Sequence, residues 1–213
     1  MFTTERISEV HNEDCMIGMS RYPDKWFDLA VTDPPYGINI NMNMGRRKGQ
    51  PKAHDDKGWD NSTPDGLYFE ELFRVSKFQI IWGGGNYFDL PITSSWIFWN
   101  KCVPEGVSFA DGELAWTSGE KTLRMATIAY SGFNGSEGKI HPTQKPVALY
   151  DWIYKNYLPQ GGKVIDTHLG SGSNRIAANK AGNIDFTGFE LDKDYYEAQE
   201  KRWKGFISQT RLF

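Results

Sequence analysis

Short apolar runs alternate with longer amphipathic segments along this chain. The runs are rich in β-branched and aromatic residues, as strands buried on both faces of a sheet are, and they span 28–32, 78–83, 96–100, 125–130, 163–167 and 185–191. Segments with helical periodicity lie between them, at 62–76, 145–158, 173–182 and 192–209. The alternation predicts an α/β fold with a doubly wound, mostly parallel sheet.

Several helix ends carry recognisable signals. Thr63 is predicted to cap the first helix, with Pro64 at its first helical position, and Gly182 is predicted to end the third. The last helix opens with acids and closes with bases, as the helix dipole favours.

The composition restricts the class of protein but does not indicate a function. A chain of 213 residues suits one domain spanning 1–213, and a net charge of −3 means that any nucleic-acid contact needs a local basic patch. Cys15 and Cys102 are too few for a disulfide framework or a zinc cage, so no metal is expected and a reducing cytoplasm fits. No run approaches the ~20 apolar residues of a membrane span, and the first residues do not form a signal peptide.

The stretch "VTDPPYGI" (31–38) directly follows an apolar run. Pro34 and Pro35 stop the strand and fix a turn. Asp33 and Tyr36 are therefore expected at the carboxyl end of a buried strand, where a carboxylate lies beside an aromatic ring.

A nucleoside-binding βαβ unit is indicated further on. One strand ends at Asp166, "GSGS" (170–173) turns into a helix, and the next strand ends near Glu190. Glycines let the backbone approach a ligand, and an acid closing the second strand can bind both ribose hydroxyls. A tight turn without a ligand is the alternative. The absence of "GK[ST]" and the departure from G-x-G-x-x-G favour a ribose without pyrophosphate, and S-adenosylmethionine is such a cofactor.

The stretch "HPTQKPVAL" (141–149) holds Lys145 between two prolines at a predicted helix start. A cation is poorly placed there against the helix dipole. Lys145 is therefore expected to meet an anion, such as the carboxylate of methionine.

These three motifs, in this order, resemble the permuted amino-methyltransferases of DNA, the beta class that modifies adenine N6 or cytosine N4. The resemblance covers most of the chain, and the short length is similar to solitary enzymes of bacteria and phages. It implies a Rossmann-like S-adenosylmethionine-dependent fold with circularly permuted motif order, acting on double-stranded DNA.

The resemblance also implies residue roles. Asp33, with the carbonyl of Pro34 in the Asp33–Pro34–Pro35–Tyr36 turn, would accept hydrogen bonds from the amine of the target base, and Tyr36 would stack on the flipped base. Glu190 would bind the ribose. The remaining cofactor positions are Asp14, Thr143, Lys145, Asp166, His168, Gly170, Ser171, Gly172 and Ser173.

Two positions depart from the family pattern. Thr167 and His168 stand where the family usually has proline and phenylalanine, which removes an apolar wall beside the cofactor. His168 is interpreted, in decreasing order of preference, as a surface residue, a base or a hydrogen-bond donor.

The polar, aperiodic segment 39–62 is too long for an ordinary connection. It holds the densest basic run, Arg46, Arg47 and Lys48, a few residues after the DPPY turn. It is either a solvated mobile loop or a DNA-contacting loop that orders on binding. A small target-recognition region is expected within 101–140 together with this loop.

The leading hypothesis is adenine N6 methylation in duplex DNA, because an aspartate leading the motif leans to adenine in the family. N4-cytosine methylation is the nearest rival. An RNA or protein methyltransferase and an inactive DNA-binding homologue are further alternatives. A homodimer and an accompanying restriction enzyme are left open, and a bacterial cell or phage-infected host is the expected setting.

Overall fold

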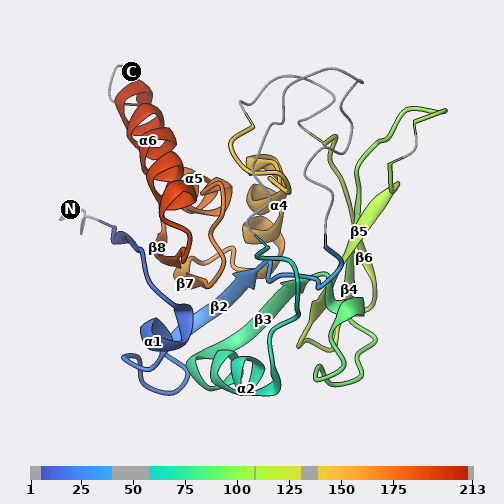
Figure 1. The fold of residues 1–213 in the computed structure, drawn as a ribbon, viewed down its shortest axis with the longest axis horizontal. Coiled ribbons are helices and arrows are strands. Elements are labelled where there is room, and N and C mark those ends of the chain that lie inside the picture. Colours follow the sequence, from blue (N-terminus) through green and yellow to red (C-terminus); the bar gives the residue numbers. More distant parts are fainter. Residues whose placement is uncertain (1–5, 40–57, 108, 131–138, 211–213) are drawn as a thin grey trace.

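The computed structural model describes residues 6–39, 58–107, 109–130 and 139–210. Its centre is one eight-stranded sheet in the order β1-β8-β7-β2-β3-β5-β4-β6 (Figure 1). The strands, in that order, are Ser8–His11, Ile184–Phe189, Gly162–Asp166, Phe27–Thr32, Ser76–Trp82, Gly112–Thr117, Trp96–Asn100 and Arg124–Thr127.

The first five strands in this order are parallel. β5 runs antiparallel to both β3 and β4, whereas β4 and β6 are parallel. A mostly parallel sheet is therefore confirmed. The six strands predicted from apolar runs are all present, while the short β1 and the antiparallel β5 were not among them.

Helices cover both faces of the sheet (Figure 1). They are α1 (Cys15–Met19), α2 (Gly66–Val75), α4 (Val147–Tyr157), α5 (Ser173–Ala181) and α6 (Lys193–Thr210), with a 3₁₀ turn η1 (Gly84–Asn86) after β3. The alternating side chains of β2 show the two layers. Leu29 and Val31 pack in the core under α4 and α5, while Ala30 packs in the core under α2.

The first predicted helix begins later than its sequence signals suggested. Its N-cap is Asp65, whose carboxylate accepts a hydrogen bond from Tyr68 N at 3.1 Å, so the prediction of Thr63 as cap and Pro64 as first helical residue is wrong. Asp is as good an N-cap as Thr, and it lies closer to the first buried turn. Gly182 does end α5, at a φ of 74°.

None of the helices in the described part of the chain combines the length and the apolar character that crossing a membrane requires.

Candidate active site

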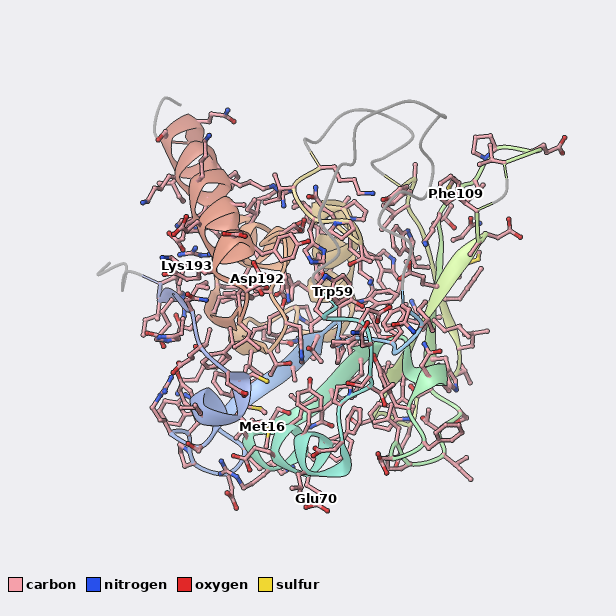
Figure 2. The ribbon with its side chains drawn as sticks, viewed as in Figure 1. Met16, Trp59, Glu70, Phe109, Asp192 and Lys193 are labelled. Carbon is pink, nitrogen blue, oxygen red and sulfur yellow. The ribbon has the colours of Figure 1, made fainter. Side chains whose placement is uncertain are left out.

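A cavity of about 640 Å³ opens at the carboxyl ends of β2, β7 and β8. It lies between the start of α6, where Asp192 and Lys193 are found, and Trp59 (Figure 2). Nine residues predicted for the site line it: Asp14, Asp33, Pro35, Thr143, Lys145, His168, Gly170, Ser171 and Glu190. The "DPPY", "HPTQKP" and "GSGS" motifs therefore meet at one cavity.

Both carboxylate oxygens of Asp33 have partners. Oδ1 accepts a hydrogen bond from the Tyr36 hydroxyl at 2.7 Å, and Oδ2 lies 2.5 Å from Lys145 Nζ. Burial raises the pKa of Asp33, and the neighbouring ammonium opposes that rise.

The DPPY turn is held from three sides. The Pro34 carbonyl accepts a hydrogen bond from the Tyr87 hydroxyl at 2.8 Å. The Tyr36 ring packs on Gly83, where a Cβ would lie 2.2 Å from a ring carbon and the φ is +71°. Asp60, which is 4% exposed, accepts hydrogen bonds from the backbone N–H groups of Tyr36 and Gly37 at 2.7 and 3.0 Å.

Sequence reasoning missed Asp60 and Tyr87. Asp60 falls within the segment 39–62, which was interpreted only as a loop, although its described end, 58–62, packs back on the turn. The glycine run 83–85 was the available signal for close packing, because consecutive glycines after a strand indicate a close approach by another group.

Asp166 lies beneath the cavity rather than in its wall. Its Oδ1 accepts from His168 N at 3.1 Å and its Oδ2 from Asn174 Nδ2 at 2.9 Å. Burial outweighs these hydrogen bonds and raises the pKa of Asp166 to about 7. Its placement is that of a residue shaping the glycine loop from below.

Glu190 anchors the glycine loop from the cavity side. Its Oε2 accepts from Gly170 N at 2.8 Å and its Oε1 from Asp192 N at 2.9 Å. Gly172 is the N-cap of α5, and Arg202 on α6 donates to Ser171 O at 2.8 Å. The cavity wall here is backbone and carboxylate.

Other residues predicted to bind the cofactor also make contacts within the protein. Asp14 caps α1 by accepting from Met16 N at 2.7 Å, and Thr143 Oγ1 lies 3.1 Å from His141 Nδ1. Ser173, the first residue of α5, accepts a hydrogen bond from Arg202 at 2.9 Å.

Lys145 is buried, with 2% of its side chain exposed. It precedes α4 instead of opening it, and its ammonium meets two carboxylates of this chain, Asp33 and Glu113. Burial would lower the pKa of Lys145, but these carboxylates outweigh it and raise that pKa. The expectation that Lys145 meets an anion is confirmed; its contact with a methionine carboxylate stays a prediction.

The first-ranked interpretation of His168 as a surface residue is wrong. Its ring lines the cavity, lies edge-on to Tyr68 at 5.4 Å, and places Nδ1 3.0 Å from Thr167 Oγ1. Burial lowers the pKa of His168 to about 4, so the imidazole is neutral at pH 7. Thr167 is also hydrogen-bonded to Thr32 at 2.6 Å, which fixes the strand ends to each other.

Three rings from distant parts of the chain form a further wall of the cavity. The Trp59 and His141 ring centroids lie 5.4 Å apart, and those of His141 and Tyr195 lie 4.4 Å apart. Trp59 and Tyr195 were not predicted, because single aromatics are usually assigned to the core.

Arg46, Arg47 and Lys48 lie outside the described residues. Within the described ranges, no group of three or more His, Cys, Asp or Glu side chains is arranged to hold a metal ion.

Comparisons with known proteins place this arrangement in a family. Residues 81–201 match the family model N6_N4_Mtase, described as DNA methylase. YubD of Escherichia coli (strain K12), named as a methylase, is 24% identical over 205 residues, covering 89% of this chain and 87% of its own.

Two solved structures share the fold. The M1.HpyAVI–SAM complex has a TM-score of 0.59 at 18% identity, covering 91% of this chain and 98% of its own. The PvuII DNA methyltransferase, described as cytosine-N4-specific, has a TM-score of 0.61 at 14% identity, covering 93% and 86%.

The fold is therefore the Rossmann-like fold of DNA methyltransferases, one of which is solved in complex with S-adenosylmethionine. The chain belongs to the N6-adenine/N4-cytosine DNA methyltransferase family.

The cavity fits this cofactor. Its volume is in the range of ligand pockets, and its wall combines aromatic rings with the carboxylates of Asp14, Glu190 and Asp192. Carboxylates suit ribose hydroxyls and a cationic sulfonium, while Lys193 suits an amino-acid carboxylate.

Glu190→Ala is expected to weaken S-adenosylmethionine binding, because it removes a charged hydrogen-bond acceptor from the cavity. The loss should be about 1.5–3 kcal/mol, roughly ten- to a hundredfold in Kd by calorimetry. Glu70→Ala, on the exposed face of α2, is the control (Figure 2). An unchanged Kd for the Glu190 variant would remove this residue from the cofactor site.

His168→Phe is expected to change how stability depends on pH. The folded pKa of His168, about 4, lies below the ordinary value of 6.5, so its stabilising contribution is complete above pH 6.5 and is lost as the pH falls towards 4. Between pH 8 and pH 5, His168 should cost the wild type on the order of 2 kcal/mol of unfolding free energy. The variant lacks this loss, so its stability relative to wild type should rise by that amount as the pH falls.

Denaturant unfolding at the two pH values measures this difference. Asp166 contributes in the opposite sense, since its raised pKa favours stability at low pH, but it is present in both proteins and cancels. Parallel stability curves for wild type and variant would contradict the assignment of a buried, neutral His168.

Proposed function

We propose that this enzyme transfers a methyl group from S-adenosylmethionine to the exocyclic N6 amine of adenine in duplex DNA. The observation that carries the proposal is that Asp33 lines the same cavity as Gly170 and Glu190. A base amine held at Asp33 would therefore lie within reach of the cofactor side of the cavity.

The proposed chemistry depends on orienting a poor nucleophile. The lone pair of an exocyclic amine is delocalised into the ring, so the amine needs both N–H groups held for its lone pair to point outward. The Asp33 carboxylate and the Pro34 carbonyl are acceptors on one fixed turn. The Tyr36 ring is assigned the role of stacking on the flipped base, because the amine cannot be reached inside the duplex.

The other residues that line the cavity are assigned roles on the cofactor side. S-adenosylmethionine supplies an electrophilic methyl group on a cationic sulfonium. Glu190 binds the ribose, Gly170 and Ser171 bring the backbone close, and the Trp59, His141 and Tyr195 rings exclude water from the cofactor side. These roles are supported by the lining of the cavity and by the family membership.

Cytosine N4 is the second candidate. The cytosine-N4-specific PvuII enzyme has a similar fold, and the geometry of the two amines is alike. The aspartate that leads "DPPY" favours adenine, because serine is commoner at that position in the cytosine enzymes of the family.

DNA contacts are proposed for Arg46, Arg47 and Lys48 in the loop 39–62, and target recognition for residues within 101–140. The chain as a whole is acidic, so these cations would supply the local patch that a polyanion needs. A single domain acting in a bacterial cell or phage-infected host, with a homodimer as an option, completes the proposal.

Methylated duplex DNA, digested to nucleosides and analysed by mass spectrometry, tests the target base. N6-methyladenine is the expected product, formed only with S-adenosylmethionine present. N4-methylcytosine would replace the proposal by its rival, and neither product from varied duplexes would reject both.

Asp33→Ala is expected to abolish methyl transfer, because the amine loses the acceptor that orients it, while the Kd for S-adenosylmethionine stays nearly unchanged. Asp89→Ala, an exposed acid beyond η1, is the matched control and should be as active as wild type. Turnover of the Asp33 variant within a few-fold of wild type would exclude this role.

A further inference from the structure

Four charged side chains, one buried and three half-buried, form a continuous series of ion pairs behind the candidate base site. They are Asp33 after β2, Lys145 before α4, Glu113 on β5 and Lys101 after β4, referred to below as the charge chain. Lys145 Nζ lies 2.5 Å from Asp33 Oδ2 and 3.1 Å from Glu113 Oε2, and Lys101 Nζ lies 2.5 Å from Glu113 Oε1. Two carboxylates thus face two ammonium groups.

Lys145 contacts the carboxylate to which the proposed function assigns the base amine. Its contact with Asp33 Oδ2 occupies one of the two carboxylate oxygens, and the Tyr36 hydroxyl occupies the other. An ammonium that stays on Asp33 at 2.5 Å takes one acceptor position of that oxygen, and its positive charge weakens the attraction of the oxygen for a neutral N–H donor. A second position for the ammonium would relieve this competition.

Glu113 offers that second position. Its Oε2 is buried and makes no aligned hydrogen bond among the described residues, although it lies within ion-pair distance of Lys145 Nζ. A buried carboxylate oxygen without a well-directed donor is costly, so a fuller contact with Lys145 would be favourable. The rings of Trp82 and Tyr36, with centroids 5.2 and 5.9 Å from Nζ, flank the ammonium.

We infer that Glu113 is a positioning residue of the active site, which draws Lys145 away from Asp33 when a base amine binds. Lys101 holds Glu113 in place for this role. The inference rests on the proposed function, since it assigns the amine to Asp33. Glu113 itself touches neither base nor cofactor.

The pKa shifts agree with an interaction of Lys145 with both carboxylates. Burial acts to raise the pKa of Glu113, but Lys145 and Lys101 outweigh it and lower that pKa to about 2. The negative charge of Glu113 in turn helps to raise the pKa of Asp33. Removing that charge should therefore lower the pKa of Asp33.

Other titratable groups face Asp33 and remain in place in such a variant. They are Tyr36 on the turn, Tyr87 beyond η1, Tyr150 on α4 and Asp166 on β7. Because Asp166 has a raised pKa of its own, the titration of Asp33 needs a residue-specific signal.

The test compares Glu113→Gln, Glu113→Asp and the control Glu120→Gln, an exposed acid beyond the end of β5. For Glu113→Gln, kcat/KM on duplex DNA should fall roughly ten- to a hundredfold, mainly through kcat, while the Kd for S-adenosylmethionine stays within about twofold. The acid limb of the pH–rate profile should move to lower pH. Glu113→Asp, which keeps the charge, should recover part of the lost rate.

A double-mutant cycle separates positioning from general destabilisation. In a Lys145→Met background, Glu113→Gln should have little further effect, because its action passes through the missing ammonium. A full additional loss in that background, or wild-type rates and an unmoved acid limb in Glu113→Gln, would overturn the inference. If Glu113→Gln does not fold, Glu113→Asp takes its place in the cycle: a loss of kcat that persists in full in the Lys145→Met background overturns the inference.

A separate readout distinguishes this inference from the proposed function. The ¹³C signal of the Asp33 carboxyl is titrated in wild type and in Glu113→Gln, without DNA. A lower midpoint for Asp33 in the variant supports the interaction of Lys145 with both carboxylates. If that shift is found but no methylated base is detected, only the proposed function fails. An equal midpoint overturns the inference whatever the activity.

Discussion

The parallel sheet forces three carboxylates together at one edge. Asp33, Asp166 and Glu190 lie at the carboxyl ends of β2, β7 and β8, which are neighbours in the sheet. Like charges brought together with little water raise one another's pKa and destabilise the fold unless each is compensated. The local structure of the site is largely the means by which these three charges are accommodated.

The negative charges of these three carboxylates are compensated by different kinds of partner. Asp166 receives two hydrogen bonds from neutral groups, and its pKa of about 7 lets it exist partly uncharged beneath the cavity. Glu190 accepts from two backbone N–H groups at a loop that needs a fixed shape. Asp33 faces the Lys145 ammonium, the partner that we infer changes position when a base binds. The three acids at this edge are thus compensated by neutral donors, by backbone N–H groups and by a charged side chain.

Local signals in the sequence were enough for six of the eight strands and for the three motifs that meet at the cavity. The run 96–100 coincides with β4, and Gly182 ends α5 as its left-handed backbone requires. Contacts between distant segments were beyond such signals. Glu113 comes from an antiparallel strand whose short mixed sequence carried no clear period, and its partner Lys145 is far along the chain. His168 looked polar and external, but Thr167 and Tyr68 hold its ring, half-buried, in the wall of the cavity.

The DPPY turn is rigid, and this bears on the role that we infer for the Lys145 ammonium. Asp60, Tyr87 and Gly83 fix the turn through backbone hydrogen bonds and a contact that leaves no room for a side chain. Acceptors held in this way need little reorganisation when an amine arrives, which is the advantage of a preorganised site. In the mechanism that we infer, the group that moves when a base binds is the Lys145 ammonium, which has carboxylates on two sides. Fixed acceptors and a movable counter-charge would together let a neutral donor bind beside the Asp33 carboxylate.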